Sequence, residues 1–501
     1  MRTKRALLNI GISLILEIVT IVYGFVVPRL FIGHFGSEVN GLVNSISNFI
    51  GYITLLQSGV GSVIKASLYK PLAQRDKMKI SVIVKTSSRF FNKIARVTVV
   101  YIAILMCFYP IFVSDSFGWL YTASLIVVLG IGTCAQYFFG ITYQMVLEAD
   151  QRAYVYSIVQ IISIVVNTFL SVFLIKSGCS VHIVKIANAV VYVARPLLTG
   201  LYVKKKYCID SNAEADSSLI KQRWDGFIQA IAYFIHSKTD VFVLTIFSTL
   251  SDVSVYSIYT LVTGGLTAVL TAIDKAVRSS FGNIIACGEK ENLQKTFSAY
   301  NNIIHIFSTI CFATAGITIY NFINIYIKGI SDTEYIRYIF GFLIITAEYI
   351  YCLRMPYNSI IFAAGKFKET KISAGIEALI NIILSCLLVP RFGLSGVAVG
   401  TLVAMCYRTI CFAYFLKTNI VFLSIRTQAR MFFSSFLAYG VSIAVLSRIH
   451  IVTPTYLSWI PYALLVFVGV CAITSAVNGV FNYKNTKESI RMIVARLNRR
   501  K

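Results

Sequence analysis

Apolar residues occur in long runs along the whole chain, and each run has about the length of a membrane crossing. A helix needs about 20 mostly apolar residues to span a bilayer. Fourteen runs of this kind occur, at residues 7–28, 42–64, 94–114, 119–146, 154–175, 183–203, 226–248, 254–274, 300–327, 336–363, 372–389, 396–416, 431–447 and 459–482. The longest gap, the 65–93 loop, is too short for a soluble catalytic domain. The pattern predicts an all-α integral membrane protein of about 14 transmembrane helices.

Composition and charge agree with this prediction. Of 501 residues, 57% are apolar and 13% are charged, whereas soluble domains carry roughly 25% charged residues. The net charge is +25, and 35 of the 46 Lys and Arg residues fall in segments that share one side of the membrane. This is the positive-inside bias. It places both termini in the cytoplasm and predicts contact with anionic membrane lipids rather than with nucleic acid.

The chain carries no signature of an enzyme. It has no G-x-x-x-x-G-K-[ST] phosphate loop, no paired carboxylates in an extramembrane loop, and no large external loop of the kind expected in a polysaccharide polymerase. Its 11 cysteines are scattered without metal-ligand spacing, which is typical of small buried side chains. We expect no cofactor, and transport energy from coupling to H⁺ or Na⁺, from the membrane potential, or from product removal.

The sequence also repeats itself at an offset of 213 or 214 residues. SEVNGLV at Ser37 matches SDVSVYS at Ser251, and NTFLSVFLIKSGCS at Asn167 matches NIILSCLLVPRFGLS at Asn381. LAQRDKMKI after the second run has a counterpart in IACGEKENL after the eighth. Internal repeats of six helices return the chain to the side on which it began, so the two copies have parallel topology, as in many secondary transporters. The predicted domains are an N-lobe at 1–215, a C-lobe at 216–428, and a terminal helix pair with a basic tail at 429–501.

Together these features resemble a family. The chain has two six-helix lobes, with LYKPLAQRDKMKI after the second helix, TDVFVLTIF in the seventh, and LIKSGCS matched by LVPRFGLSG. In these features it is similar to the polysaccharide flippases of the multidrug/oligosaccharidyl-lipid/polysaccharide exporter superfamily. The resemblance implies a V-shaped bundle in the bacterial cytoplasmic membrane that flips undecaprenyl-pyrophosphate-linked oligosaccharide repeat units by alternating access. O-antigen, capsule or exopolysaccharide units are the implied cargo, and a polysaccharide polymerase with its chain-length machinery are the implied partners.

Placing an ionisable side chain within the bilayer costs free energy, and such residues commonly have a function. Glu17 and Lys238 lie at the middle of repeat-equivalent spans, and His236 and Asp240 share one helical face near Lys238. We expect Lys238 to line the cavity and meet a pyrophosphate, with Asp240 or Glu17 as counter-charge or proton site. The alternative is a structural ion pair of Lys238 with Glu17 or Asp240. His236 is a packing residue or a proton carrier.

Three further positions complete the predicted site. Arg354, with Glu348 nearby and Pro356 interrupting the backbone ladder, marks a candidate broken helix, while Glu377 has no evident partner. Lys65 and Arg278, at cytoplasmic helix ends, either gather the lipid-linked anion or are ordinary solvated cations. Two competing functions stay open: a cation-coupled multidrug exporter of the same superfamily, and an integral-membrane polysaccharide polymerase or glycosyltransferase.

Overall fold

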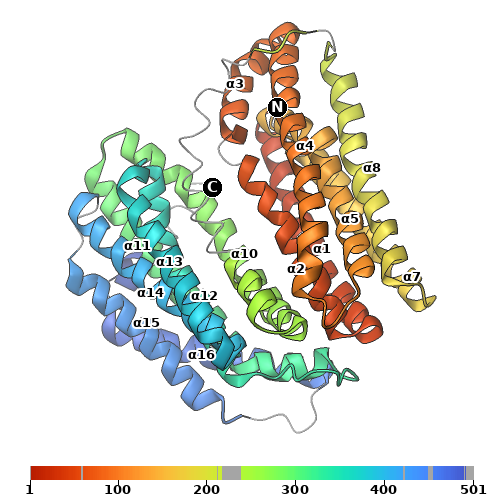
Figure 1. Ribbon diagram of the computed structural model, residues 1–501. Coiled ribbons are helices and arrows are strands. Elements are labelled where there is room, and N and C mark those ends of the chain that lie inside the picture. Colours follow the sequence, from red (N-terminus) through yellow and green to blue (C-terminus); the bar gives the residue numbers. More distant parts are fainter. Residues whose placement is uncertain are drawn as a thin grey trace. The chain divides into compact units, whose positions relative to one another are not determined.

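All regular structure in the described part of the chain is helical (Figure 1). The computed structural model describes residues 2–57, 60–210, 213–216, 238–420, 424–449, 455–483, 485–489 and 491. Twelve helices within these ranges are long and apolar enough to cross a membrane. The all-α membrane fold is therefore confirmed. The predicted span at 226–248 lies mostly outside the described residues.

The chain divides into two compact units. Unit 1 comprises Met1–Phe234 and Thr249–Ser254, and unit 2 comprises Ile235–Ser248 and Val255–Lys501. The helices of unit 1 are α1 (Arg2–Phe35), α2 (Ser37–Gly51), η1 (Tyr52–Gln57), α3 (Val60–Gln74), α4 (Lys77–Phe112), α5 (Trp119–Ala135), η2 (Gln136–Gly140), α6 (Ile141–Ala149), α7 (Ala153–Lys176) and α8 (Val181–Tyr207). Here η1 is a 3₁₀-helix and η2 a π-helix.

Unit 2 begins with a helix at 238–247 and continues through α10, whose first turn is counted in unit 1. Its helices are α10 (Leu250–Ala286), α11 (Lys290–Tyr326), α12 (Tyr338–Ala363), α13 (Phe367–Phe392), α14 (Leu394–Asn419), α15 (Ile425–Leu446) and α16 (Tyr456–Phe481). The last two helices pack on each other and on α11, so they extend the helical core of unit 2.

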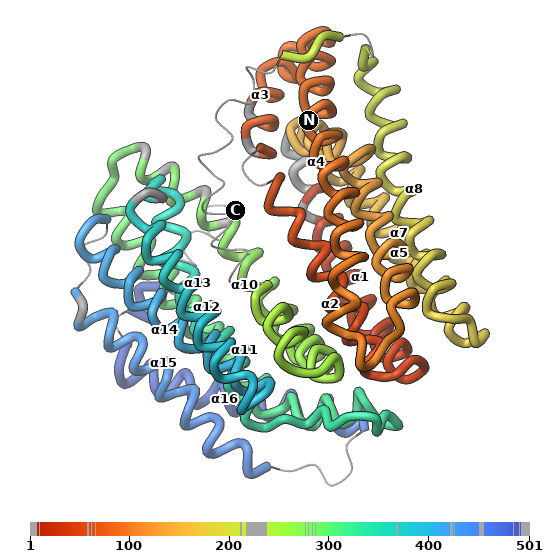
Figure 2. Tube along the Cα trace, viewed as in Figure 1, coloured from red at the N-terminus to blue at the C-terminus, as the bar shows by residue number. Residues whose placement is uncertain are grey.

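The same packing order recurs in both units. In unit 1, α7 packs on α8, α8 on α5, and α5 on α4; in unit 2, α13 packs on α14, α14 on α12, and α12 on α11. The pairs α7–α8 and α13–α14 each lie side by side in Figures 1 and 2. Gly178 and Gly393, which the sequence repeat aligns, join these pairs with φ angles of 73° and 52°. Glycine adopts this left-handed backbone at no steric cost, so each pair turns at the same place.

The predicted span at 42–64 is not one helix. The chain passes from α2 through the 3₁₀-helix η1 to α3, with residues 58–59 outside the described part. A 3₁₀ segment within a helical run commonly marks a hinge or a strained sequence. Neither Pro nor a charge interrupts GYITLLQSG, so hydropathy alone gave no sign of the change.

Polar contacts and a close backbone approach fix the beginning of α10 within unit 1. A Cβ atom on Gly41 would lie 1.7 Å from the carbonyl oxygen of Leu250, so only glycine fits there. One residue earlier, the Asn40 side-chain amide donates to Ser254 Oγ at 2.8 Å. Small residues allow such close helix contact in membranes.

Candidate functional site

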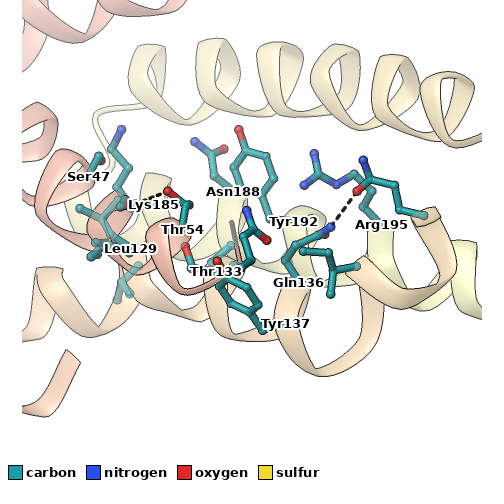
Figure 3. Close-up of a pocket in the computed structure, with 18 of the residues that line it drawn as sticks. Ser47, Thr54, Leu129, Thr133, Gln136, Tyr137, Lys185, Asn188, Tyr192 and Arg195 are labelled. Atoms are coloured by element: carbon teal, nitrogen blue, oxygen red, sulfur yellow. Dashed lines mark hydrogen bonds between the residues drawn. The ribbon is translucent and has the colours of Figure 1, made fainter. Parts of the chain in front are cut away.

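Unit 1 contains a partly open cavity of about 820 Å³, lined by both polar and apolar groups. This is within the range of pockets that hold a drug-sized ligand, roughly 300–1,000 Å³. Its wall is formed by residues of α1, α2, η1, α3, α5, η2, α6 and α8. Figure 3 shows Asn188 and Tyr192 between Lys185 and Arg195, with Gln136 and Tyr137 across the cavity from α8.

One face of α8 supplies two of the three cationic residues of this wall, Lys185 and Arg195. Lys185, Asn188, Tyr192 and Arg195 recur every three to four residues and all line the cavity, as neighbours on one helical face do. The Lys185 ammonium lies 4.3 Å from the centre of the Phe31 ring. The Arg195 guanidinium lies 5.7 Å from the Tyr192 ring. Aromatic faces stabilise both cations without neutralising their charge.

A chain of hydrogen bonds crosses the wall on the opposite side. Lys65 Nζ lies 3.1 Å from Glu148 Oε2 in an ion pair. The Gln144 amide donates to Glu148 Oε1 at 2.9 Å, and the Gln136 amide donates to Gln144 at 3.3 Å. Gln136 is the first residue of the π-helix η2, a kind of segment that is frequent at functional sites. Of the predicted site residues that the structure describes, only Lys65 lines this cavity.

The cavity carries an excess of positive charge. The lining residues that carry a charge at neutral pH are Lys65, Glu148, Lys185 and Arg195. Glu148 is paired with Lys65. Within the described ranges, neither Lys185 nor Arg195 has a carboxylate within ion-pair distance. Lys185 and Arg195 are both half-buried, and two such cations favour an anion, because the attraction between opposite charges grows as the local dielectric falls.

Unit 2 holds a buried carboxylate at a second polar centre. Asp240 is 4% exposed and accepts hydrogen bonds from Tyr256 OH and Thr401 Oγ1, each at 2.9 Å. The Asn381 amide reaches Asp240 Oδ1 at 3.4 Å and Thr401 Oγ1 at 2.9 Å. Oxygen atoms such as those of the Asp240 carboxylate are the ligands that hard cations prefer. The centre joins the 238–247 helix to α10, α13 and α14.

The structure corrects the prediction for Arg354. Its guanidinium pairs with Glu377 Oε1 at 2.7 Å rather than with Glu348, and Arg408 Nε lies 3.6 Å from Glu377 Oε2. Glu377 therefore has two partners, although the sequence suggested none. Pro356 lies inside the continuous helix α12, so the predicted helix break is wrong. The three charged side chains are all buried and form one ion-paired group in unit 2.

Arg278 belongs to another buried group in unit 2. It donates to Asp274 Oδ2 at 2.9 Å and to Ser359 Oγ at 3.2 Å. Tyr300 OH donates to the same carboxylate at 2.7 Å, as does Ser359. With a side chain 37% exposed, Arg278 is partly open while Asp274 is enclosed.

The other predicted residues are dispersed. Glu17 is exposed on α1, Lys238 is half-buried at the first described residue of its helix, and His236 lies outside the described residues. In unit 2, half-buried Glu348 accepts a hydrogen bond from Thr267 at 3.3 Å. The roles assigned to these residues from the sequence stay predictions.

Sequence reasoning overlooked Lys185, Asn188 and Gln136 as site residues. A signal existed for Lys185, since it is one of two cations, with Arg195, within the apolar run at 183–203. Asn188 and Arg195 follow on the same helical face. Nothing in the sequence distinguished the π-helix that carries Gln136. The described residues contain no group of three or more His, Cys, Asp or Glu placed to hold a metal ion.

No protein-family model matches the chain, and no curated protein sequence matches it. Solved structures do. The structure titled lipid II flippase MurJ, in an inward closed conformation, superposes with a TM-score of 0.71 over 94% of this chain and 99% of the other, at 15% identity. An inward-facing multidrug resistance MATE family transporter of the MOP superfamily gives 0.60 over 80% and 96%, at 12% identity. The MATE multidrug transporter DinF-BH gives 0.60 over 83% and 97%, at 16% identity. The chain thus shares the fold of these three solved structures.

Proposed function

We propose that the chain flips undecaprenyl-pyrophosphate-linked oligosaccharide units across the bacterial cytoplasmic membrane, for assembly of a surface polysaccharide. The observation that carries this proposal is the pair of uncompensated cations, Lys185 and Arg195, in the cavity of unit 1. The similarity to a lipid II flippase supports it, since that protein is named for a lipid substrate. The substrate would then pass to a polymerase that acts on the outer side of the membrane.

The charge of the cavity suits a pyrophosphate better than a drug cation. A lysine ammonium is a compact point charge that binds phosphate well, and an arginine guanidinium offers planar donors to phosphate oxygens. A lipophilic cation entering the same space would meet two half-buried positive charges without a carboxylate partner in the described residues. In the proposed cycle the two cations hold the pyrophosphate while the cavity opens to one side and then to the other.

Asp240 is the proposed coupling site of this cycle. Its carboxylate is buried among hydroxyl and amide groups, so binding H⁺ or Na⁺ would remove a costly buried charge. Asn381 and Thr401 both touch Asp240, and they come from neighbouring helices α13 and α14. A bound cation would therefore change the contacts between three helices of unit 2.

A cation-coupled multidrug exporter is the second candidate. Buried Asp240 and half-buried Glu348 in unit 2 favour it, since carboxylates attract cationic drugs, and two of the similar structures are titled as multidrug transporters. The two candidates differ in the sign of the charge that their substrates carry.

Reconstitution into liposomes tests the choice. Purified protein is assayed for transbilayer movement of a fluorescent undecaprenyl-pyrophosphate-linked oligosaccharide, with a lipophilic cationic dye in parallel. Lys185→Gln and Arg195→Gln should each slow the lipid by about 10- to 100-fold, the worth of one charged hydrogen bond. Lys176→Gln, which removes an exposed cation outside the cavity, is the control. Transport of the dye alone would overturn the flippase proposal.

A further inference from the structure

The middle of the unit 1 cavity is lined by uncharged hydrogen-bonding groups. Between the cations Lys185 and Arg195 lie Asn188 of α8 and, across from it, Gln136 and Tyr137 of η2 (Figure 3). These side chains offer an amide, a second amide and a phenol. They give the cavity a neutral centre between its positive groups.

Among the described residues, several polar atoms of the cavity lining have no hydrogen-bond partner in the protein. Tyr137 is 4% exposed, and its hydroxyl makes no hydrogen bond within the described residues. Gln57 and Arg195 also line the cavity, and Gln57 Oε1 and Arg195 Nε likewise make no hydrogen bond within the described residues. Asn188 uses its Oδ1 to accept from Ser171 at 3.1 Å, which leaves its Nδ2 donor for the cavity. Buried polar groups are rarely left unsatisfied in native proteins, and a bound ligand or water commonly completes them.

Flat aromatic surfaces adjoin these groups. Tyr23, Tyr137 and Tyr192 all line the cavity, so a ligand there meets both hydrogen-bonding groups and ring faces. A sugar ring has the complementary chemistry, because its hydroxyls donate and accept while its C–H faces are apolar. A hydrocarbon chain would leave the amides and the phenol unpaired, at a cost for each.

We propose that this neutral centre is a carbohydrate subsite, and that Tyr137, Asn188 and Gln136 set which sugar the protein accepts. The inference rests on the proposed function, in which the cations bind the pyrophosphate of the same substrate. It assigns the two parts of the substrate to different residues: anionic groups to Lys185 and Arg195, and hydroxyl groups to the residues between them.

The π-helix supports this assignment. Gln136 and Gln144 are eight residues apart, yet their side-chain amides meet at 3.3 Å. That hydrogen bond, continued to Glu148, holds Gln136 in place against the cavity. A wall that is held in this way recognises a ligand at a lower entropic cost than a mobile one.

Binding of matched probes tests the subsite. Affinities of the detergent-solubilised full chain are measured for bare farnesyl pyrophosphate and for three farnesyl-pyrophosphate disaccharides, containing neutral hexoses, N-acetylated hexosamines or a uronic acid. At least one disaccharide should bind about 10-fold more tightly than the bare lipid. Tyr137→Phe and Asn188→Ala should each reduce this ratio by about 3- to 10-fold, as expected for one uncharged hydrogen bond.

Tyr101→Phe is the matched control. It also removes one phenolic hydroxyl, but that hydroxyl donates to the Phe49 carbonyl oxygen at 2.8 Å and does not line the cavity. The ratio should be unchanged in this variant. If bare farnesyl pyrophosphate binds and the ratio is one for all three sugars, or is unaffected by both cavity variants, the subsite is refuted while the proposed function stands. If no pyrophosphate lipid binds, both fail.

Discussion

Arg195 in unit 1 and Arg408 in unit 2 stand at equivalent places of the repeat, but their surroundings differ. Arg408 is 8% exposed, lies 3.6 Å from Glu377, and donates to Ser373 Oγ at 3.1 Å. Arg195 lines a cavity, has aromatic neighbours and lacks a carboxylate partner within the described part of the chain. The same residue type therefore closes a packed interior in one unit and remains available to a ligand in the other.

The contrast extends to the two polar centres. Unit 1 presents uncompensated cations to an open volume, whereas unit 2 encloses its carboxylates among hydroxyls, amides and arginines. A duplicated fold can divide two tasks in this way, with substrate binding in one copy and ion coupling in the other.

The largest effect is expected from Glu377→Gln. This change leaves Arg354 and Arg408 buried beside each other without a carboxylate, and breaking a buried ion pair costs about 3–5 kcal/mol. Thermal unfolding in detergent should show a strong loss of stability. Arg195→Gln in unit 1 is the comparison and should leave the free energy of unfolding nearly unchanged. Equal losses in both variants would contradict the contrast between the two arginines.

Asp240→Asn should affect coupling rather than substrate affinity. We expect stimulation of transport by an H⁺ or Na⁺ gradient to fall by about 10-fold, the scale of one charged hydrogen bond, with substrate affinity kept. Lys185→Gln should do the reverse, by weakening substrate binding while a gradient still stimulates residual transport. Transport in liposomes with and without each gradient measures both. Identical defects in the two variants would show that the units do not divide the tasks.

A smaller effect distinguishes two aligned asparagines. Asn381 donates to Thr401 and to Asp240, so Asn381→Leu should cost about 1–3 kcal/mol. Asn167 is fully buried, and neither side-chain polar atom has a partner in the described ranges. Asn167→Leu should therefore be neutral or raise stability by up to about 1 kcal/mol. Unfolding of the two variants in parallel decides this, and a clear destabilisation by Asn167→Leu would refute it.

The smallest effect concerns the ion pair Lys65–Glu148. Its side chains are 35% and 32% exposed, and pairs that contact water contribute at most about 1 kcal/mol. Lys65→Gln should shift the unfolding temperature only slightly, in contrast to Glu377→Gln in the buried group of unit 2. A loss comparable to that of Glu377→Gln would mean that the unit 1 pair is as enclosed as the unit 2 group.

Hydropathy and the repeat were sufficient to predict the fold class, because apolar runs and turn glycines such as Gly178 and Gly393 are local signals. The site was harder to predict. Arg354 and Glu377 lie 23 residues apart on α12 and α13, and their pairing depends on helix packing that no local pattern specifies. Likewise, Lys185 is visible in the sequence as a charge, but only the arrangement of α8 against α5 and η2 shows that it borders a cavity.

The π-helix at Gln136–Gly140 also fixes a helical phase. A π turn holds about one residue more than an α turn, so η2 takes up one extra residue within a single turn, and α5 and α6 on its two sides keep nearly the phase of one continuous helix. The same extra residue in a regular α-helix would lengthen the span by only about 1.5 Å but rotate one end against the other by roughly 100°, which would turn the polar face away from the cavity. Length and hydropathy would hardly change, so the π turn between Gln136 and Gly140 carries information that composition does not.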